Sequence, residues 1–145
     1  PMAMLPFCGY NMGDYFAHWL AVGKKMKKPP KIFTINWFRT DDSGKFIWPG
    51  FGDNIRVLKW VIDRVNGRVG AQETPVGNLP HRNDLDMSGL SISKEDIDRL
   101  FAIDAGEWEK ETADTEEFFK KFGSHLPKEL SEELHGLKAR LKGKG

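Results

Sequence analysis

The stretch GDNIRVLKWVIDRVNG (52–67) restricts the fold more than any other part of the chain. Its apolar residues recur at the three- and four-residue spacing of an amphipathic helix. Asp53 or Asn54 can cap the start, and Gly67 suits the end. We expect the buried face of this helix to consist of four apolar residues: Ile55, Leu58, Ile62 and Val65.

The segment before this helix is rich in aromatic residues and predicts a β-hairpin. KIFTINWF (31–38) is β-branched and aromatic without a breaker, which is typical of a strand. RTDDSGK (39–45) is polar and carries the Ser-Gly signal of a turn. FIW (46–48) then predicts a second short strand, which Pro49 ends because proline has no N–H to donate.

The remainder of the chain is predicted to be mainly helical. Residues 12–28 have helical spacing and stop at Pro29-Pro30, and SKED (93–96) is typical of a helix start. Further helices are expected up to Gly123, whereas residues 69–90 predict a long ordered loop. The last helix carries a docking stripe of four leucines: Leu130, Leu134, Leu137 and Leu141.

The fold class expected from these patterns is α/β: a short β-hairpin or sheet edge packed by several helices. The 145 residues suffice for one domain with a core. No apolar run approaches the eighteen or so residues of a membrane helix, and no leader is recognised. The single cysteine, Cys8, excludes an internal disulfide and suits a reducing cytoplasm. The leading Pro1 suggests a piece of a longer protein.

The net charge of +1 conceals two unlike halves. Residues 1–70 carry 11 Lys/Arg against 5 Asp/Glu, and residues 71–145 carry 11 against 16. The basic half suits an anionic ligand, although two ordinary solvated faces explain the same counts. The basic residues are too sparse for a nucleic-acid stripe.

Few residues offer catalytic chemistry. The histidines, His18, His81, His125 and His135, form no cluster and lack the i, i+4 spacing of helical metal ligands. Cys8 has no histidine nearby in sequence and is interpreted as a small packing residue. No glycine-rich loop ending in Lys-Ser/Thr occurs. We therefore expect neither catalytic residues nor metal ligands in this chain.

The aromatic stretch GKFIWPGFGDN (44–54) is compatible with two structures. Its rings can form an ordinary core corner, as strand aromatics usually do. Alternatively, a hairpin brings Phe38 near Phe46, and the turn at Pro49-Gly50 directs Phe51 back toward them. Rings around a gap can stack on a planar heterocycle, worth roughly 1–3 kcal/mol per base. The amide of Asn54 could read such a base.

NWFRTDDSGKFIWPGFGDN (36–54) closely resembles the guanine-binding segment of the GTP-dependent phosphoenolpyruvate carboxykinases. The resemblance continues in PMAMLPFCGYNMGDYFAHWL (1–20), NIRVLKWVIDRVNG (54–67) and TPVGNLP (74–80), and more loosely in the acidic helices. Leu5 is more similar to the bacterial enzymes. The resemblance implies that the chain is the C-terminal part of the nucleotide-binding domain, with residues 1–80 binding guanine and residues 81–145 forming a mainly helical, acidic scaffold.

The family converts oxaloacetate and GTP to phosphoenolpyruvate, CO2 and GDP, with Mn²⁺ and Mg²⁺. The resemblance places six residues at guanine-binding positions: Phe38, Phe46, Phe51, Gly52, Asp53 and Asn54. It places Phe7 near the carboxylic-acid substrate. Asp53 departs from the family, which often has Glu there. The phosphate loop, the metal ligands and the substrate arginines are expected upstream of Pro1, so we expect this chain alone to be inactive.

Other functions and states stay open at this point. The main alternative is an interaction module whose aromatic patch binds a peptide or a single strand of nucleic acid, although only Arg39 and Lys45 accompany the rings. The resemblance implies a cytoplasmic enzyme, monomeric at full length, with no nucleic-acid or membrane partner. The isolated chain could self-associate through exposed core surface.

Overall fold

The computed structural model describes residues 2–143, which form two compact units. Unit 1 comprises Pro1–Pro30 and Asp104–Gly145, and unit 2 comprises Lys31–Ile103. Five α-helices and one two-stranded antiparallel sheet occur within the described residues. The predicted fold class, several helices with one small antiparallel sheet, is confirmed, although the sheet lies between residues 72 and 79. The functional division at residue 80 concerns ligand binding and stays a prediction.

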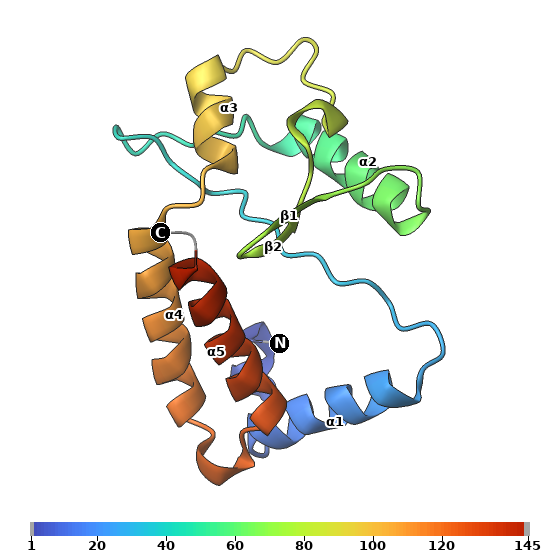
Figure 1. Ribbon diagram of the computed structural model, residues 1–145, viewed down its shortest axis with the longest axis vertical. Helices are drawn as coiled ribbons and strands as arrows, with labels where there is room; N and C mark the ends of the chain where they lie inside the picture. Colours follow the sequence, from blue (N-terminus) through green and yellow to red (C-terminus); the bar gives the residue numbers. More distant parts are fainter. Residues whose placement is uncertain (1, 144–145) are drawn as a thin grey trace. The chain divides into compact units, whose positions relative to one another are not determined.

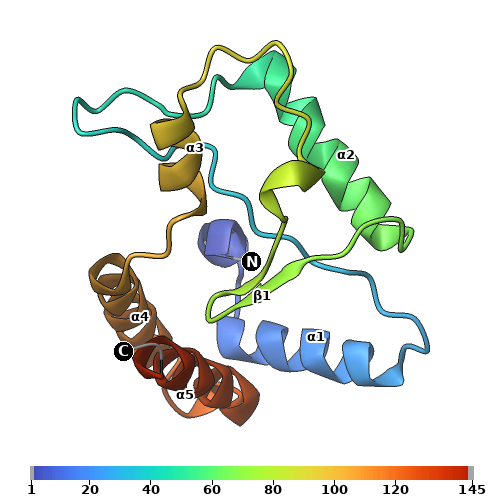
Figure 2. The same cartoon turned by 45° about the horizontal axis from the view of Figure 1, so that its top comes forward.

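Unit 1 contains three helices, α1 (Met12–Lys25), α4 (Ala105–Lys120) and α5 (Lys128–Lys142), with short 3₁₀ turns η1 (Met2–Phe7) and η4 (Gly123–His125). α4 and α5 lie side by side (Figures 1 and 2). In the leucine stripe, Leu134 is buried and the other three leucines are half-buried. The stripe is thus a docking surface within the unit, as predicted.

The start of α1 is tied to the segment that follows α4. The Asn11 side chain caps α1 by accepting from the Gly13 N–H at 2.8 Å. Its Nδ2 donates to the carbonyl oxygen of Phe122 at 3.2 Å. Phe122 is buried, and its ring meets Phe16 and Phe118 edge-on at centroid distances of 5.5 and 5.1 Å. The Asn11 side chain therefore pairs with both a backbone N–H at the start of α1 and the Phe122 carbonyl beside the core.

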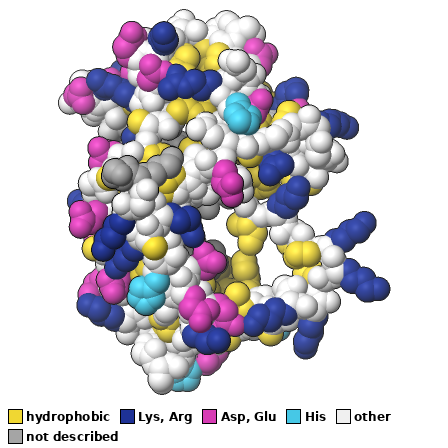
Figure 3. All heavy atoms as spheres, viewed as in Figure 1, with side chains coloured by type: hydrophobic (Ala, Val, Ile, Leu, Met, Phe, Trp, Pro, Cys, Tyr) yellow, Lys and Arg dark blue, Asp and Glu magenta, His cyan; other side chains and the backbone are white. Residues whose placement is uncertain are grey.

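α1 ends at Lys25, three residues before the predicted end at residue 28. The backbone of Met26 is already extended, and its N–H bonds back to the Gly23 carbonyl. Lys and Arg side chains gather around this end of the helix (Figure 3), and Lys24 pairs with Glu129 at 2.7 Å. The lysines therefore act as a solvated helix terminus, where positive charge is favourable.

Unit 2 contains α2 (Asn54–Val65), α3 (Lys94–Phe101) and the hairpin of β1 (Gln72–Thr74) and β2 (Gly77–Leu79). β1 pairs with β2 from Gln72↔Leu79 to Thr74↔Gly77. The prediction that residues 69–90 form only a long ordered loop is wrong, because the hairpin of β1 and β2 lies inside this range. Gly77 has φ +121°, and the Thr74 hydroxyl donates to its carbonyl at 2.6 Å. The strands are too short to produce a clear alternation pattern.

The predicted strands at 31–38 and 46–48 are wrong. Residues 31–38 are irregular, and the expected hairpin is reduced to one bridge between Thr40 and Phe46. The Asn36 side chain accepts from the Phe38 N–H at 2.9 Å, which removes a donor from any ladder. In this segment the high aromatic content therefore belongs to a half-buried loop and not to a strand.

The prediction that α2 buries its aliphatic face is also wrong. Four residues of that face are 42–62% exposed: Ile55, Leu58, Ile62 and Val65. The helix instead buries Trp60, whose ring meets Phe33 edge-on at 5.9 Å. Helical spacing correctly predicted one apolar face, but within the described structure that face stays largely exposed to solvent.

The loop before the predicted site is attached to α3. Arg39 donates to the Ala102 carbonyl at 3.1 Å, and Arg99 pairs with Asp42 at 3.0 Å. Both views place this loop beside α3 (Figures 1 and 2). α3 itself begins as predicted, because the Ser93 side chain caps it by accepting from the Asp96 N–H.

Candidate functional site

A hollow of about 520 Å³ lies in unit 2 where the aromatic loop meets the start of α2. Its lining comes from two short segments, residues 37–38 and 45–54. The lining residues are mostly aromatic: Trp37, Phe38, Lys45, Phe46, Trp48, Pro49, Gly50, Phe51 and Asn54. The hollow therefore joins aromatic faces to one amide and one ammonium group.

Three predicted phenylalanines meet at this hollow and face solvent. Phe38, Phe46 and Phe51 are 69%, 57% and 98% exposed. The rings of Phe38 and Phe46 lie 5.7 Å apart, tilted by 59°. Beneath them Ile47 and Trp48 are buried. The loop thus buries Ile47 and Trp48 and leaves the three phenylalanine rings in solvent. Core packing therefore explains the two buried side chains but not the exposed rings.

The backbone at Gly50 and Phe51 is unusual. Gly50 has φ +86° and ψ −172°, a region open essentially only to glycine. Phe51 begins the short turn η2 (Phe51–Asp53) with φ +22°, the one positive value among the described non-glycine residues. Such a conformation costs of order 1–3 kcal/mol. Strain of this kind is concentrated at ligand-binding positions.

The turn preceding Phe46 is organised by Asp41. Its Oδ1 accepts from the Ser43 hydroxyl at 2.6 Å, the Ser43 N–H at 2.8 Å and the Lys45 N–H at 3.0 Å. These bonds, that from the Ser43 hydroxyl first, lower the pKa of Asp41 below its ordinary value of 3.8. The ionised carboxylate therefore holds Lys45 and Phe46 in position at the hollow.

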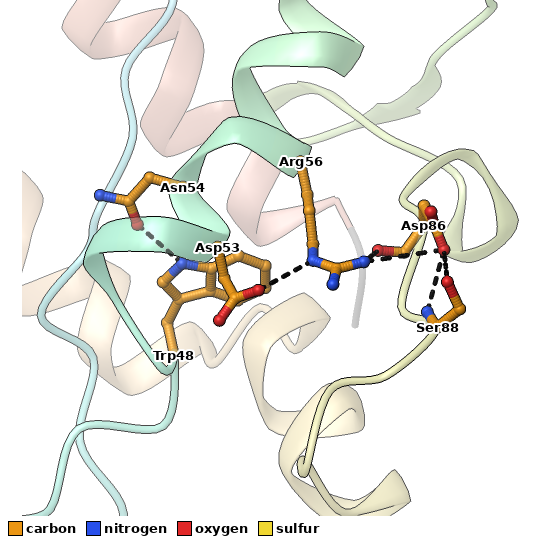
Figure 4. A network of polar contacts seen from close by, with 6 residues as sticks. All are labelled: Trp48, Asp53, Asn54, Arg56, Asp86 and Ser88. Atoms are coloured by element: carbon orange, nitrogen blue, oxygen red, sulfur yellow. Dashed lines mark hydrogen bonds and ion pairs between the residues drawn. The ribbon is translucent and has the colours of Figure 1, made fainter.

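Neither predicted cap of α2 makes a capping hydrogen bond from its side chain. The carboxylate of Asp53 instead accepts from Arg56 Nε at 3.0 Å (Figure 4). The Oδ1 of Asn54 accepts from Trp48 Nε1 at 2.9 Å. Both side chains are thus engaged in tertiary contacts, which outcompete local capping.

Arg56 links the start of α2 to a second loop. Its Nη1 donates to the Asp86 carbonyl at 2.7 Å and lies 3.7 Å from the Asp86 carboxylate (Figure 4). The Ser88 hydroxyl and N–H lower the pKa of Asp86, and the charge of Arg56 adds to this effect. Asp53 and Gly52 are absent from the lining of the hollow. The Asp53 carboxylate therefore contacts Arg56 and does not line the hollow.

Five lining residues lie outside the predicted set of binding residues: Trp37, Lys45, Trp48, Pro49 and Gly50. Trp37 and Trp48 have ring centroids 6.5 Å apart. A signal was present, because Trp48 lies in the quoted aromatic motif six residues before Asn54. Its hydrogen bond to Asn54 has no signature in sequence, since it depends on the turn at Gly50.

The other singled-out residues lie outside this hollow. Phe7 is 81% exposed and belongs to unit 1, as does the half-buried Cys8. His18 and His135 are exposed, whereas His125 Nδ1 lies 2.8 Å from Asp14. Across residues 2–143 we find no group of three or more His, Cys, Asp or Glu able to hold a metal ion. In the same range no helix is long and apolar enough to cross a membrane.

A second hollow, of about 610 Å³, lies in unit 2 around the turn η3 (Arg82–Asp84). Its lining is a loop with Ile97 of α3. Arg82 is engaged there by Asp98 and lies 5.8 Å from the ring of Phe101. These charged groups are therefore committed to local contacts, and the aromatic hollow is the better candidate site.

The described residues form a mixed α/β fold with an aromatic hollow that carries one amide and one ammonium group. The chain belongs to the family of the phosphoenolpyruvate carboxykinase C-terminal P-loop domain, whose model matches residues 1–140. The predicted family is confirmed.

Three curated relatives are GTP-dependent phosphoenolpyruvate carboxykinases. Those of Corynebacterium kroppenstedtii and Neocallimastix frontalis are 48% and 51% identical, each over 98% of this chain and 23% and 24% of the relative. That of Renibacterium salmoninarum is 50% identical over 97% of this chain and 24% of its own length. The chain thus spans about a quarter of the length of these relatives.

Proposed function

We propose that this chain is the guanine-nucleotide-binding C-terminal portion of a phosphoenolpyruvate carboxykinase. The complete enzyme would convert oxaloacetate and GTP to phosphoenolpyruvate, CO2 and GDP. The observation that carries the proposal is the hollow that Phe38, Phe46 and Phe51 line together with Asn54. The relatives are GTP-dependent enzymes, which indicates that the nucleotide is a guanine nucleotide.

The lining of the hollow is better suited to the base of the nucleotide than to its phosphates. Exposed aromatic faces stack on a planar base, and a side-chain amide can pair with its edge. The lining carries one positive charge, that of Lys45, so little there would neutralise a triphosphate. We therefore assign base selection to this chain and phosphate binding to residues outside it.

We likewise assign metal binding to residues outside this chain. Mn²⁺ and Mg²⁺ would need ligands from elsewhere in the enzyme, because the described carboxylates and imidazoles form no suitable group. We propose that the isolated chain is inactive and that the enzyme is cytoplasmic. Phe7, which is exposed on unit 1, would lie near the carboxylic-acid substrate.

Steady-state kinetics of the full-length protein test this proposal. We expect Phe51→Ala and Asn54→Ala to raise the KM for GTP at least tenfold and to change that for oxaloacetate much less. Phe7→Ala should show the opposite preference. Equal effects of all three substitutions on both substrates would contradict the assignment.

Binding measurements separate this function from the interaction-module alternative. We expect GTP and ITP, but not ATP, to compete for the site. An oligonucleotide or peptide that binds at physiological salt and is not displaced by GTP would favour the alternative. The single lining charge of Lys45 argues against a strand of nucleic acid, whose backbone needs several cations.

A further inference from the structure

The hydrogen bond between Trp48 and Asn54 fixes the orientation of the Asn54 amide. An indole N–H is a donor only, so the atom facing Trp48 Nε1 at 2.9 Å has to be the amide oxygen. Trp48 is 6% exposed and packs beside Trp37. The indole is therefore held by its own packing and acts as a fixed reference for the amide.

The other end of the amide is available to a ligand. Figure 4 shows Nδ2 of Asn54 directed away from the indole. Nδ2 has no hydrogen-bond partner among residues 2–143, and Asn54 lines the hollow. The side chain therefore offers two N–H donors, next to an oxygen whose second lone pair is still free.

This arrangement matches one class of purine. A 6-oxopurine, such as guanine or hypoxanthine, presents the O6 acceptor beside the N1–H donor. Adenine presents the reverse, an amino donor beside the N1 acceptor. Rotating the amide by 180° would suit adenine, but it would then bring Nδ2–H against the indole N–H and leave the buried indole donor of Trp48 unpaired.

We infer that Trp48 is a positioning residue that makes the site select 6-oxopurines over 6-aminopurines, by locking the Asn54 amide in one orientation. This inference rests on the proposed function, because it concerns the base that the same hollow binds. It assigns the selection to a residue that need not touch the base.

Calorimetric titration of the full-length protein with GDP, IDP and ADP tests the inference. Trp48→Phe keeps an aromatic ring and removes the N–H. We expect the preference for GDP over ADP to fall about tenfold or more. IDP keeps O6 and lacks the 2-amino group, so its affinity should fall in parallel with that of GDP.

Trp60→Phe is the matched control. Trp60 is also buried in unit 2, but it lies outside the hollow and its Nε1 has no partner in the described structure. Its replacement should leave the GDP-to-ADP ratio within about twofold of wild type. If loss of a buried indole lowered the ratio only by destabilising unit 2, both variants would show the same change in the GDP-to-ADP affinity ratio.

The outcomes separate the two proposals. A wild-type protein without preference for GDP over ADP would overturn the proposed function. A wild-type preference that survives Trp48→Phe would overturn the role of Trp48 alone. If Trp48→Phe does not fold, Trp48→Leu decides, because it also removes the indole N–H and leaves Asn54 in place. The preference for GDP over ADP should again fall about tenfold. An unchanged preference would refute the inference.

Discussion

Gly13 and His125 pass so close to each other that no side chain fits between them. A Cβ on residue 13 would lie 2.4 Å from the His125 carbonyl oxygen and 2.9 Å from the His125 Cβ. The first turn of α1 and the η4 turn are therefore in direct backbone contact. This approach lies beside the Asn11–Phe122 hydrogen bond and defines the packing of unit 1.

Gly13→Ala should lower the free energy of unfolding by about 1–3 kcal/mol, because backbone has to shift to admit the methyl group. Urea denaturation measures the change. Gly23→Ala, in the same helix, meets nothing within 4 Å and should be neutral or stabilising by up to about 1 kcal/mol. Equal stabilities of the two variants would show that the close approach carries no energy.

Arg56→Ala should destabilise unit 2 by about 1–3 kcal/mol, because it breaks the bridge from Asp53 to the Asp86 carbonyl. The Arg56 side chain is only 20% exposed. Lys59→Ala is the control on α2, since Lys59 is 73% exposed and its pair with Asp63 should contribute under about 0.5 kcal/mol. Chemical denaturation should separate the variants; equal losses would contradict the bridging role.

Acid should disorder the turn before Phe46. The folded pKa of Asp41 lies below its ordinary value of 3.8, so its stabilising hydrogen bonds are fully present above pH 3.8 and are lost as the pH falls through the folded value. We expect the amide NMR signals of Ser43 and Lys45 to titrate with a midpoint below 3.8. A midpoint above 3.8 would contradict the predicted bonds. Asp41→Asn should abolish this titration.

The exposed face of α2 should make the isolated chain associate. Ile62→Glu places a charge in that face and should weaken self-association at least about tenfold in sedimentation equilibrium. Ile32→Glu is the matched control, because Ile32 is 78% exposed but lies outside the helix. If the wild-type chain stays monomeric up to about millimolar concentration, this face does not mediate self-association.

Local patterns predicted most helices well and the connecting backbone poorly. Ser93 and Gly67 marked helix limits because capping depends on neighbours in sequence. The segment 31–38 failed because strand propensity needs a pairing partner, and the Asn36 side chain offered the backbone a local one.

The site shows the same limit. The rings of Phe38, Phe46 and Phe51 were predictable as a group, because the motif and the turn bring them near one another. The engagement of Asn54 by Trp48 and of Asp53 by Arg56 was not, since both follow from tertiary geometry. Capping rules alone assigned these two side chains to the helix backbone.

The solvent exposure of the three phenylalanines has a thermodynamic consequence. A base that covers Phe38, Phe46 and Phe51 removes apolar surface from water, and this gives association a negative heat-capacity change. The binding enthalpy should then become more negative on warming, while the affinity changes less because entropy compensates. If the hollow binds a base as proposed, the exposed rings would make the enthalpy of that binding depend on temperature.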